Sequence, residues 1–250
     1  MNLNGRVAVV TGASSGIGAA VAQKLADQGA SVALLARRKS ALDELVSAIR
    51  ESGGTAASFV VDVTDRNALT AAAALIEDEL GSAGIVVNNA GIMLPTPLSR
   101  IEDSDWTRQI DLNVGAVNNT VTAFTQQLLR SAEDYGVADL VNTASIAGRN
   151  LFPTYSAYAA SKAYVIHLSK NLRAEFAPKN VRVSVVEPGI VDSELQSHIA
   201  DDAARDRLAS TRERIEWLNP ADIAEVMAYT VGLPAHVNLS EITVLPTHQI

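Results

Sequence analysis

Short runs of apolar, often β-branched residues recur along the chain and alternate with longer stretches in which apolar residues are spaced as on one face of a helix. The first run is followed by a glycine-rich turn and by a helical pattern through Val21 and Leu25 that Gly29 ends. Runs without polar alternation are typical of strands covered on both faces. Strands are predicted at Val7–Val10, Val32–Leu35, Ser58–Val61, Ile85–Val87, Asp139–Val141, Val181–Val186 and Ile242–Leu245.

Helical periodicity fills the intervals between these runs, most clearly at Leu42–Ile49, Ala71–Leu80, Asp105–Arg130 and Tyr158–Phe176. Regular alternation of strands and helices predicts an α/β fold with a doubly wound, parallel sheet of about seven strands flanked by helices. No low-complexity linker divides the 250 residues, so we expect a single domain over residues 1–250.

Two stretches depart from the alternation, at residues 93–103 and 187–217. The second begins with Pro188-Gly189 and continues with polar and charged residues. Ligands of doubly wound sheets bind beyond the carboxyl ends of the strands, so an irregular segment after the sixth strand is well placed to cover a site. We expect a substrate lid at about residues 190–217, and a solvated surface loop is the alternative.

Composition and charge exclude several functional classes. The chain has 28 Asp+Glu against 20 Lys+Arg, a formal net charge of −8, and its basic residues are scattered, so nucleic acid is not an expected partner. No window is apolar enough for a membrane helix, so no membrane partner is expected either. The absence of Cys excludes disulfides and thiolate chemistry and fits a cytoplasmic protein. The four His have no metal-ligand spacing, and no metal site is predicted.

The turn after the first strand, Gly12–Gly18, carries three glycines and leads into a helix. A helix N-terminus offers unpaired N–H groups and the positive end of the helix dipole to a pyrophosphate, and glycines let the phosphates approach closely. A tight strand-to-helix connection with no ligand is the structural alternative.

Arg37 and Arg38 follow the second strand, at the place where an acidic residue would hold the ribose 2′-hydroxyl of NAD. Two guanidinium groups instead match a 2′-phosphate through charge-assisted hydrogen bonds, which favours NADP(H) as the cofactor. The alternative is that this pair ends a strand in solvent.

Tyr158 and Lys162 lie four residues apart in a segment whose composition favours helix, so both side chains project from one face. A phenol has a pKa near 10, and lowering that pKa to about 7 takes roughly 4 kcal/mol of differential stabilisation. We therefore expect the ammonium group of Lys162 to lower the pKa of Tyr158 and make it a general acid and base at neutral pH.

Together and in this order, the motifs resemble the short-chain dehydrogenase/reductase family over essentially the whole chain. Thr11–Gly18 resembles the cofactor turn of the family, Asp62-Val63 its adenine contact, Asn88–Gly91 the motif that closes the fourth strand, and Pro188-Gly189 the start of the segment facing the nicotinamide. The resemblance implies a Rossmann-like fold and NADP(H) contacts from Gly12, Ser14, Ser15, Gly16, Ile17, Gly18, Arg37, Arg38, Asp62, Val63, Asn89, Ala90, Gly91, Tyr158, Lys162, Pro188, Gly189, Ile190, Val191 and Ser193. Two mild departures are Ala144, where Ser is frequent, and Ser193, where Thr is usual.

Asn113, Ser145, Tyr158 and Lys162 resemble the catalytic tetrad of this family. The resemblance implies that Tyr158 exchanges a proton with the substrate, Ser145 hydrogen-bonds the substrate oxygen, and Lys162 both lowers the phenol pKa and holds the nicotinamide ribose. It also implies that Asn113 anchors a water linking Lys162 to solvent. The implied activity is an NADP(H)-dependent oxidoreductase that interconverts a ketone or aldehyde, possibly carboxylated, with the corresponding alcohol by hydride transfer.

Substrate contacts are expected from the same end of the molecule. Arg149, four residues after Ser145, is placed to meet a substrate carboxylate through its guanidinium fork, and the alternative is a solvated or ion-paired surface arginine. Met93, Tyr155 and Leu195 are expected to form apolar walls of the pocket.

The C-terminal half, especially Asn219–Ala224 and Ile242–Gln249, is similar to the branch of the family that holds NADP-dependent 3-hydroxy acid dehydrogenases and the aldehyde reductase of clavulanic acid biosynthesis. Two rival functions stay open: a catalytically silent NADP-binding sensor, and an epimerase or dehydratase that uses NAD(P). The long helices Asp105–Arg130 and Tyr158–Phe176 serve as subunit contacts in similar proteins, which implies a homodimer or homotetramer.

Overall fold

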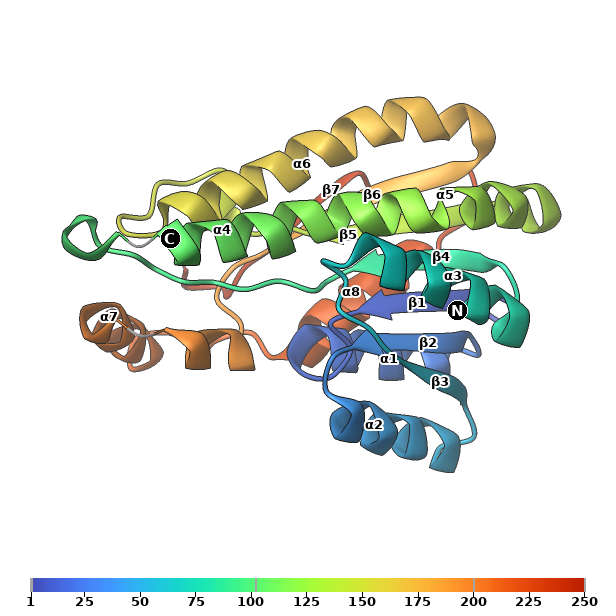
Figure 1. Ribbon diagram of the computed structural model, residues 1–250, viewed down its shortest axis with the longest axis horizontal. Helices are drawn as coiled ribbons and strands as arrows, with labels where there is room; N and C mark the ends of the chain where they lie inside the picture. The colour runs from blue at the N-terminus through green and yellow to red at the C-terminus, as the bar shows by residue number, and fades with distance from the viewer. Residues whose placement is uncertain (1, 102, 200, 250) are drawn as a thin grey trace.

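Seven parallel strands form one sheet in the order β3-β2-β1-β4-β5-β6-β7, as seen in a computed structural model that describes residues 2–101, 103–199 and 201–249 (Figure 1). Each predicted run lies in or overlaps one strand, and every neighbouring pair is parallel. The predicted doubly wound α/β sheet is therefore confirmed. The strands are β1 (Val7–Thr11), β2 (Ser31–Ala36), β3 (Thr55–Val60), β4 (Ala83–Asn88), β5 (Ala138–Thr143), β6 (Val181–Pro188) and β7 (Glu241–Val244).

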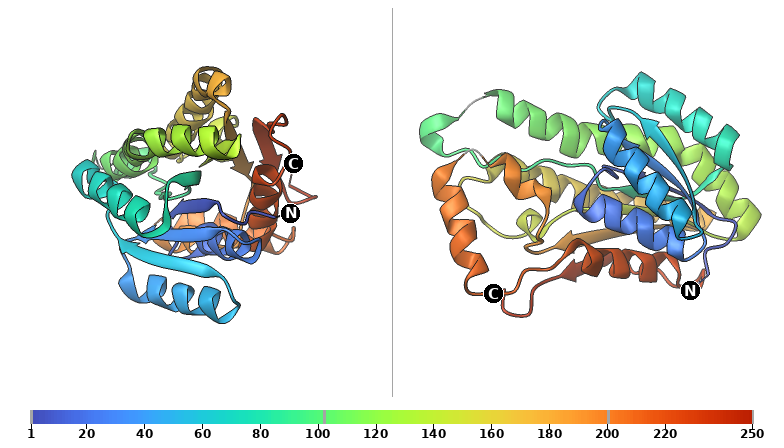
Figure 2. Two further views of the ribbon diagram at one scale, coloured as in Figure 1. Left: turned by 90° about the vertical axis from the view of Figure 1, so that its right-hand side faces the viewer. Right: turned by 90° about the horizontal axis from the view of Figure 1, so that it is seen from below.

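Helices cover both faces of the sheet (Figures 1 and 2). On one face, Ala22 and Ala26 pack in the same core as Ala224 and Ala228, and these small side chains let two helices approach each other and the strands closely. The core of the opposite face contains larger side chains such as Phe124. The first face carries α1 (Gly16–Asp27), α2 (Lys39–Glu51) and α8 (Pro220–Val231), and the second carries α3 (Arg66–Leu80), α5 (Ala116–Tyr135) and α6 (Ser156–Phe176).

The helix predicted at Asp105–Arg130 is not continuous. It consists of α4 (Asp103–Ile110), a π-helical turn at Asp111–Gly115 and α5. A π-helical turn bonds residue i to residue i+5 and re-aims the residues within it, and such turns are frequent at functional sites. Asn113 lies in this turn and is buried.

The connection from β6 to α8 leaves the sheet and carries two short elements of its own, a 3-10 turn at Glu194–His198 and α7 (Asp202–Arg212). In Figures 1 and 2, α7 stands apart from the helices that flank the sheet. An isolated parallel bridge between Val191 and Leu218 joins the two ends of the connection. The range predicted as a lid thus corresponds to one protruding segment.

Within the described residues, no helix has the length and apolar character needed to cross a membrane.

Candidate active site

A cavity of about 580 Å³ opens beyond the carboxyl ends of the strands, where the strand order reverses between β1 and β4. Ligands of doubly wound sheets bind at such a reversal. Of the residues predicted from the sequence, Gly18, Asn113 and Arg149 do not line this cavity. The others do: Gly12, Ser14, Ser15, Gly16, Ile17, Arg37, Arg38, Asp62, Val63, Asn89, Ala90, Gly91, Met93, Ser145, Tyr155, Tyr158, Lys162, Pro188, Gly189, Ile190, Val191, Ser193 and Leu195.

The turn after β1 depends on close backbone contacts. Gly12 has a φ of +67°, and a Cβ added to it would lie 2.9 Å from the Cα of Ala90. A Cβ on Gly18 would lie 2.3 Å from the carbonyl oxygen of Gly12. Gly16 also has a positive φ, +55°, but a Cβ there would meet only the Cβ of Ser193, at 3.4 Å. Gly12 and Gly18 therefore serve packing, whereas Gly16 leaves open space at the cavity wall.

The N-terminus of α1 faces this open space. Its N-cap residue, Ser15, forms no side-chain capping hydrogen bond, whereas Asp65 caps α3 and Asn219 caps α8. The first N–H groups of α1 therefore lack a capping oxygen from Ser15, and the positive end of the helix dipole adds to their attraction for an anion. A pyrophosphate fits these groups.

Thr11 joins the two strands that border the reversal. Its hydroxyl donates to the carbonyl of Val87 at 3.3 Å and accepts the backbone N–H groups of Asn89 and Ala90 at 3.0 and 3.1 Å. The side-chain amide of Asn89 returns a bond to the carbonyl of Thr11 at 3.2 Å. These bonds hold the end of β4 against the glycine turn, so both walls of the nucleotide end of the cavity are fixed relative to each other.

Arg38 lies directly beside the glycine turn. Its guanidinium donates to the hydroxyls of Ser14 and Ser15 at 3.0 and 2.7 Å, and its Nη2 lies 2.9 Å from a carboxylate oxygen of Glu194 in the segment beyond β6. Arg37 is more exposed and has Nη1 3.8 Å from Asp62. Both arginines line the cavity, which places two permanent positive charges at its nucleotide end.

Asp62, the predicted adenine contact, is held in place by its neighbours. Its carboxylate accepts the backbone N–H of Thr64 at 3.0 Å and the hydroxyl of Thr64 at 2.7 Å. Burial alone would raise the pKa of Asp62, but these hydrogen bonds and the charge of Arg37 outweigh it and lower the pKa below its usual value.

Tyr158, Ser145 and Lys162 meet at the wall of the cavity. Tyr158 and Lys162 are both buried on α6, and the Nζ of Lys162 lies 5.7 Å from the centre of the Tyr158 ring. The Ser145 side chain lies close enough to the Tyr158 hydroxyl to act on its pKa, which it lowers. Lys162 donates to the carbonyl of Thr143 at 2.9 Å, which fixes its side chain beneath the tyrosine. Two hydroxyls and an ammonium group thus converge in the cavity that the glycine turn borders.

The short chain dehydrogenase family model matches residues 6–204 of this chain. The protein is a short-chain dehydrogenase. Among its relatives, the sulfoacetaldehyde reductase 2 of Chromohalobacter salexigens is 34% identical over 246 residues, which is 97% of this chain and 95% of that protein.

Solved structures of other short-chain dehydrogenases have the same fold. The closed form of a serine dehydrogenase complexed with NADP⁺ aligns with a TM-score of 0.86 at 29% identity, over 98% of this chain and 96% of that chain. The 3-ketoacyl-(acyl-carrier-protein) reductase of Brucella melitensis complexed with NADH aligns with a TM-score of 0.87 at 26% identity, over the full length of both chains. The chain is thus an oxidoreductase of an NAD(P)-binding family.

The prediction that Lys162 brings the pKa of Tyr158 close to 7 is wrong for this structure. Burial raises the pKa of Tyr158 to about 12, and the hydrogen bond from Ser145 acts in the opposite direction without reversing the shift. Burial also lowers the pKa of Lys162 to about 8. Desolvation disfavours the charged form of each group, and at the wall of this dehydrogenase cavity it is the largest cause of both shifts. Tyr158 is therefore a neutral phenol at pH 7.

Asn113 supports the site from behind the cavity wall. Its side-chain amide accepts the N–H of Ile92 at 2.9 Å and donates to the carbonyl of Ile92 at 2.9 Å, and it also donates to the hydroxyl of Ser161 at 3.1 Å. The side chain of Asn113 therefore has its hydrogen-bonding groups occupied by the strand-following loop and by α6. Its predicted role as a water anchor stays a prediction.

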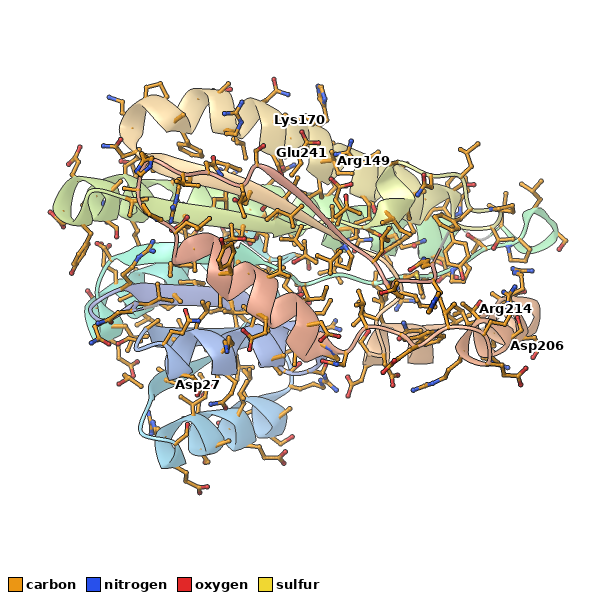
Figure 3. The ribbon with its side chains drawn as sticks, turned by 180° about the vertical axis from the view of Figure 1, so that it is seen from behind. Asp27, Arg149, Lys170, Asp206, Arg214 and Glu241 are labelled. Atoms are coloured by element: carbon orange, nitrogen blue, oxygen red, sulfur yellow. The ribbon has the colours of Figure 1, made fainter. Side chains whose placement is uncertain are left out.

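Arg149 does not reach the substrate end of the cavity, which corrects its predicted role. Its Nη2 lies 2.7 Å from Glu187, whose side chain is fully buried, and it also pairs with Glu241, which Lys170 approaches at 3.0 Å (Figure 3). Two carboxylates thus hold the guanidinium behind the site, one near the carboxyl end of β6 and the other at the first residue of β7. The alternative considered for Arg149, an ion-paired arginine, is the one that the structure shows.

The substrate end of the cavity has apolar walls around Tyr158 and polar side chains at its rim. Met93 and Tyr155 pack with Tyr158 in one apolar cluster, to which Ile199, Ala204, Leu195 and Leu208 of the protruding segment also belong. Phe152, which the apolar character of its segment also suggested as a pocket wall, lines the cavity as well. Several other lining residues were not predicted as site residues, because nothing in their local sequence marks them: Glu194, Arg207, Leu208, Thr211 and Gln249.

No group of three or more His, Asp or Glu in the described part of the chain could hold a metal ion.

Proposed function

We propose that this short-chain dehydrogenase interconverts a small aldehyde or ketone with the corresponding alcohol, using NADP(H), with Tyr158 as the general acid and base. The observation that carries the proposal is the meeting of Tyr158, Ser145 and Lys162 in the wall of the cavity that the glycine turn also borders, with the Nζ of Lys162 5.7 Å from the centre of the Tyr158 ring. Among the described residues that line this cavity, Lys162 is the one lysine.

The protonation state of the site fits the reductive direction. NADPH, when bound, supplies the hydride to the carbonyl carbon. The alkoxide oxygen that forms is far more basic than a phenolate, so a phenol with a pKa of about 12 can donate its proton to it. Ser145 donates a hydrogen bond to the same oxygen, which stabilises the negative charge as it develops. In the oxidative direction Tyr158 takes the proton of the alcohol.

The nucleotide end supports NADP(H) over NAD(H). The pyrophosphate would lie on the first turn of α1, next to Gly16. Arg38 and Arg37 would hold the 2′-phosphate, since both line the cavity and no acidic residue follows β2 directly. The serine dehydrogenase complexed with NADP⁺ also favours NADP(H). The reductase of Brucella melitensis is complexed with NADH, so binding of both cofactors to this protein has to be measured.

The protruding segment at residues 190–217 would act as the lid of the substrate end. Leu195 and Leu208 from this segment share an apolar cluster with Tyr158, so a substrate next to Tyr158 would be covered by them. We further propose a homodimer or homotetramer formed through α5 and α6, which Tyr164 already links by its hydrogen bond to Asn118. Light scattering of the purified protein tests the oligomeric state.

Steady-state consumption of NADPH against a panel of aldehydes, ketones and 3-oxo acids tests the function. A reductase consumes one NADPH for each alcohol formed, with the alcohol identified by mass spectrometry. A silent sensor would bind NADPH without turnover, and an epimerase or dehydratase would change a substrate without net consumption of NADPH. Either of these outcomes would overturn the proposal.

A further inference from the structure

We propose that Arg207 of α7 is a specificity residue that binds an anionic group of the substrate, a carboxylate or sulfonate, at the rim of the cavity. This inference rests on the proposed function and adds to it a class of substrate, a carbonyl compound that carries a negative charge. It also replaces the role predicted for Arg149, which the structure assigns to an ion-paired position behind the site.

The placement of α7 supports this role. Arg207, Leu208 and Thr211 line the cavity, and Arg207 and Thr211 are four residues apart on the same face of the helix. Leu208 belongs to the apolar cluster that contains Tyr158 and Tyr155, so this face of α7 lies over the substrate end and not over the nucleotide end. The guanidinium of Arg207 therefore stands at the mouth of the space in which the carbonyl group would react.

The electrostatics of Tyr155 agree with this placement of Arg207. Burial raises the pKa of Tyr155, the charge of Arg207 acts to lower it, and the charge of Asp201 acts to raise it. Both charges therefore lie close to the Tyr155 hydroxyl. The carboxylate of Asp201 is already engaged at the end of α7, where its Oδ1 accepts the N–H of Ala204 at 2.8 Å.

The charges that line the cavity divide into two groups. Arg37 and Arg38 lie at the nucleotide end with Asp62 and Glu194 as their partners. At the substrate end, the buried ammonium of Lys162 donates to a backbone carbonyl below Tyr158. Arg207 is the second cation at this end. Within the described residues, Arg207 forms no ion pair and its side chain donates no hydrogen bond, and its side chain is exposed at the rim.

An arginine in this setting suits an anionic ligand. Its guanidinium keeps its charge at any physiological pH and offers two parallel N–H groups to a carboxylate or sulfonate. Because the apolar cluster below excludes water on one side, the ion pair would be less screened than an ion pair on the open surface. A substrate held at Arg207 by its charge and at Tyr158 and Ser145 by its carbonyl oxygen would be fixed at both ends.

Matched substrates test the proposal. Acetoacetate and methyl acetoacetate, and succinic semialdehyde and its methyl ester, have the same reacting group with and without a charge. Charged hydrogen bonds of this kind change kcat/KM by about 10-fold to 100-fold. We expect the native enzyme to prefer the charged member of at least one pair by that factor, and R207Q to lose the preference while the rate with the ester stays within about twofold. R207K should recover part of the preference.

The matched control is R214Q. Arg214, labelled in Figure 3, follows α7 in the same segment, and its Nε donates to the carbonyl of Ser210 at 3.2 Å. It does not line the cavity, so R214Q should keep the preference for charged substrates. Equal losses of rate with acid and ester in R207Q would overturn the inference and leave the reductase function standing.

A binding measurement keeps the inference testable without turnover. In the presence of NADP⁺, titration calorimetry with butanoate and butanamide compares an anion with a neutral molecule of similar shape. Butanoate should bind the native protein more tightly than butanamide does, and R207Q should remove the difference. Equal affinities of the native protein for the two compounds would overturn the role of Arg207. Absence of NADPH consumption with every carbonyl tested would overturn the proposed function instead.

Discussion

The guanidinium of Arg38 and the carboxylate of Glu194 form an ion pair, with 2.9 Å between Nη2 and Oε2. This pair joins the loop after β2 to the segment beyond β6 across the nucleotide end of the cavity. A 2′-phosphate bound to Arg38 would compete with Glu194 for the same N–H groups. Under the proposed function, binding of NADP(H) would therefore act directly on the segment that carries α7.

The first prediction concerns cofactor choice. R38Q should weaken the binding of NADPH by about 10-fold or more, because a charge-assisted hydrogen bond contributes about 1.5–3 kcal/mol, and the binding of NADH by less than about twofold. R37Q/R38Q should have the larger effect. Fluorescence titration with each nucleotide measures both affinities. K39Q is the control, since Lys39 is exposed and pairs with Asp43. Equal losses for NADPH and NADH would indicate a structural role for the arginines.

A second prediction concerns the proton donor. Y158F should lower kcat by about 10²-fold to 10⁴-fold, because the phenyl ring has no proton to transfer, while the dissociation constant of NADPH stays within about twofold. Stopped-flow and equilibrium titration separate the two effects. Y164F is a matched control on the outer part of α6 and should leave kcat unchanged. Native-like turnover by Y158F would remove Tyr158 from the chemistry.

The pKa of Tyr158 also predicts how the two reaction directions depend on pH. Reduction requires the neutral phenol, which predominates at every pH well below about 12, so its kcat should be nearly constant from about pH 6 to 9. Oxidation requires Tyr158 to accept a proton, and the fraction of phenolate rises tenfold for each pH unit below that pKa. The kcat of alcohol oxidation should therefore rise steeply over the same range. Parallel profiles in the two directions would contradict this assignment.

The buried charge of Lys162 should lower the free energy of unfolding of the protein. Burial lowers its pKa from 10.5 to about 8, so the unfolded chain binds this proton more tightly than the folded protein does. At about 1.36 kcal/mol per pKa unit, K162M should raise the free energy of unfolding at pH 7 by up to about 3 kcal/mol. The cost is fully present below about pH 8 and disappears as the pH rises through 10.5.

Denaturant unfolding of K162M and native protein at about pH 7 and pH 10 measures this difference, which should be smaller at the higher pH. K179M replaces an exposed lysine and should change neither value. A destabilised K162M at neutral pH would mean that the bond from Lys162 to the Thr143 carbonyl contributes more than the burial of the charge costs.

Arg149 gives a prediction about stability and not about substrate binding. R149M leaves the fully buried carboxylate of Glu187 without its partner, and should lower the free energy of unfolding by about 2–4 kcal/mol. The double variant R149M/E187Q removes the buried charge and should recover most of this loss. The KM ratio of acetoacetate to its methyl ester should not change. A charge-dependent change in KM with unaltered stability would return Arg149 to the substrate site.

Much of the fold follows from local sequence, because a strand buried on both faces needs a continuous apolar run, and runs such as Val7–Val10 and Ile85–Val87 have few other uses. The π-helical turn at Asp111–Gly115 was not predictable in this way. Its residues fit an ordinary helix, and the hydrogen bonds that accompany the turn join Asn113 to Ile92, 21 residues earlier in the chain.

The site was predictable where its residues are close together in the sequence. It was less predictable where only the packing of the fold decides which residue faces the cavity. Tyr158 and Lys162 are one helical turn apart, so their proximity follows from the helix. Arg149 and Arg207 are both arginines in polar segments, and only the packing of α7 over Tyr155 and the closeness of Glu187 distinguish the two. The pKa of Tyr158 likewise depends on its burial, a property of the whole fold.

The amide of Asn113, bound on both sides to the backbone of Ile92, affects how mutants of this enzyme are interpreted. N113A would remove the two hydrogen bonds that hold the loop after β4. Loss of activity in N113A would therefore report the loss of this contact, and would not test whether a water next to Asn113 transfers protons.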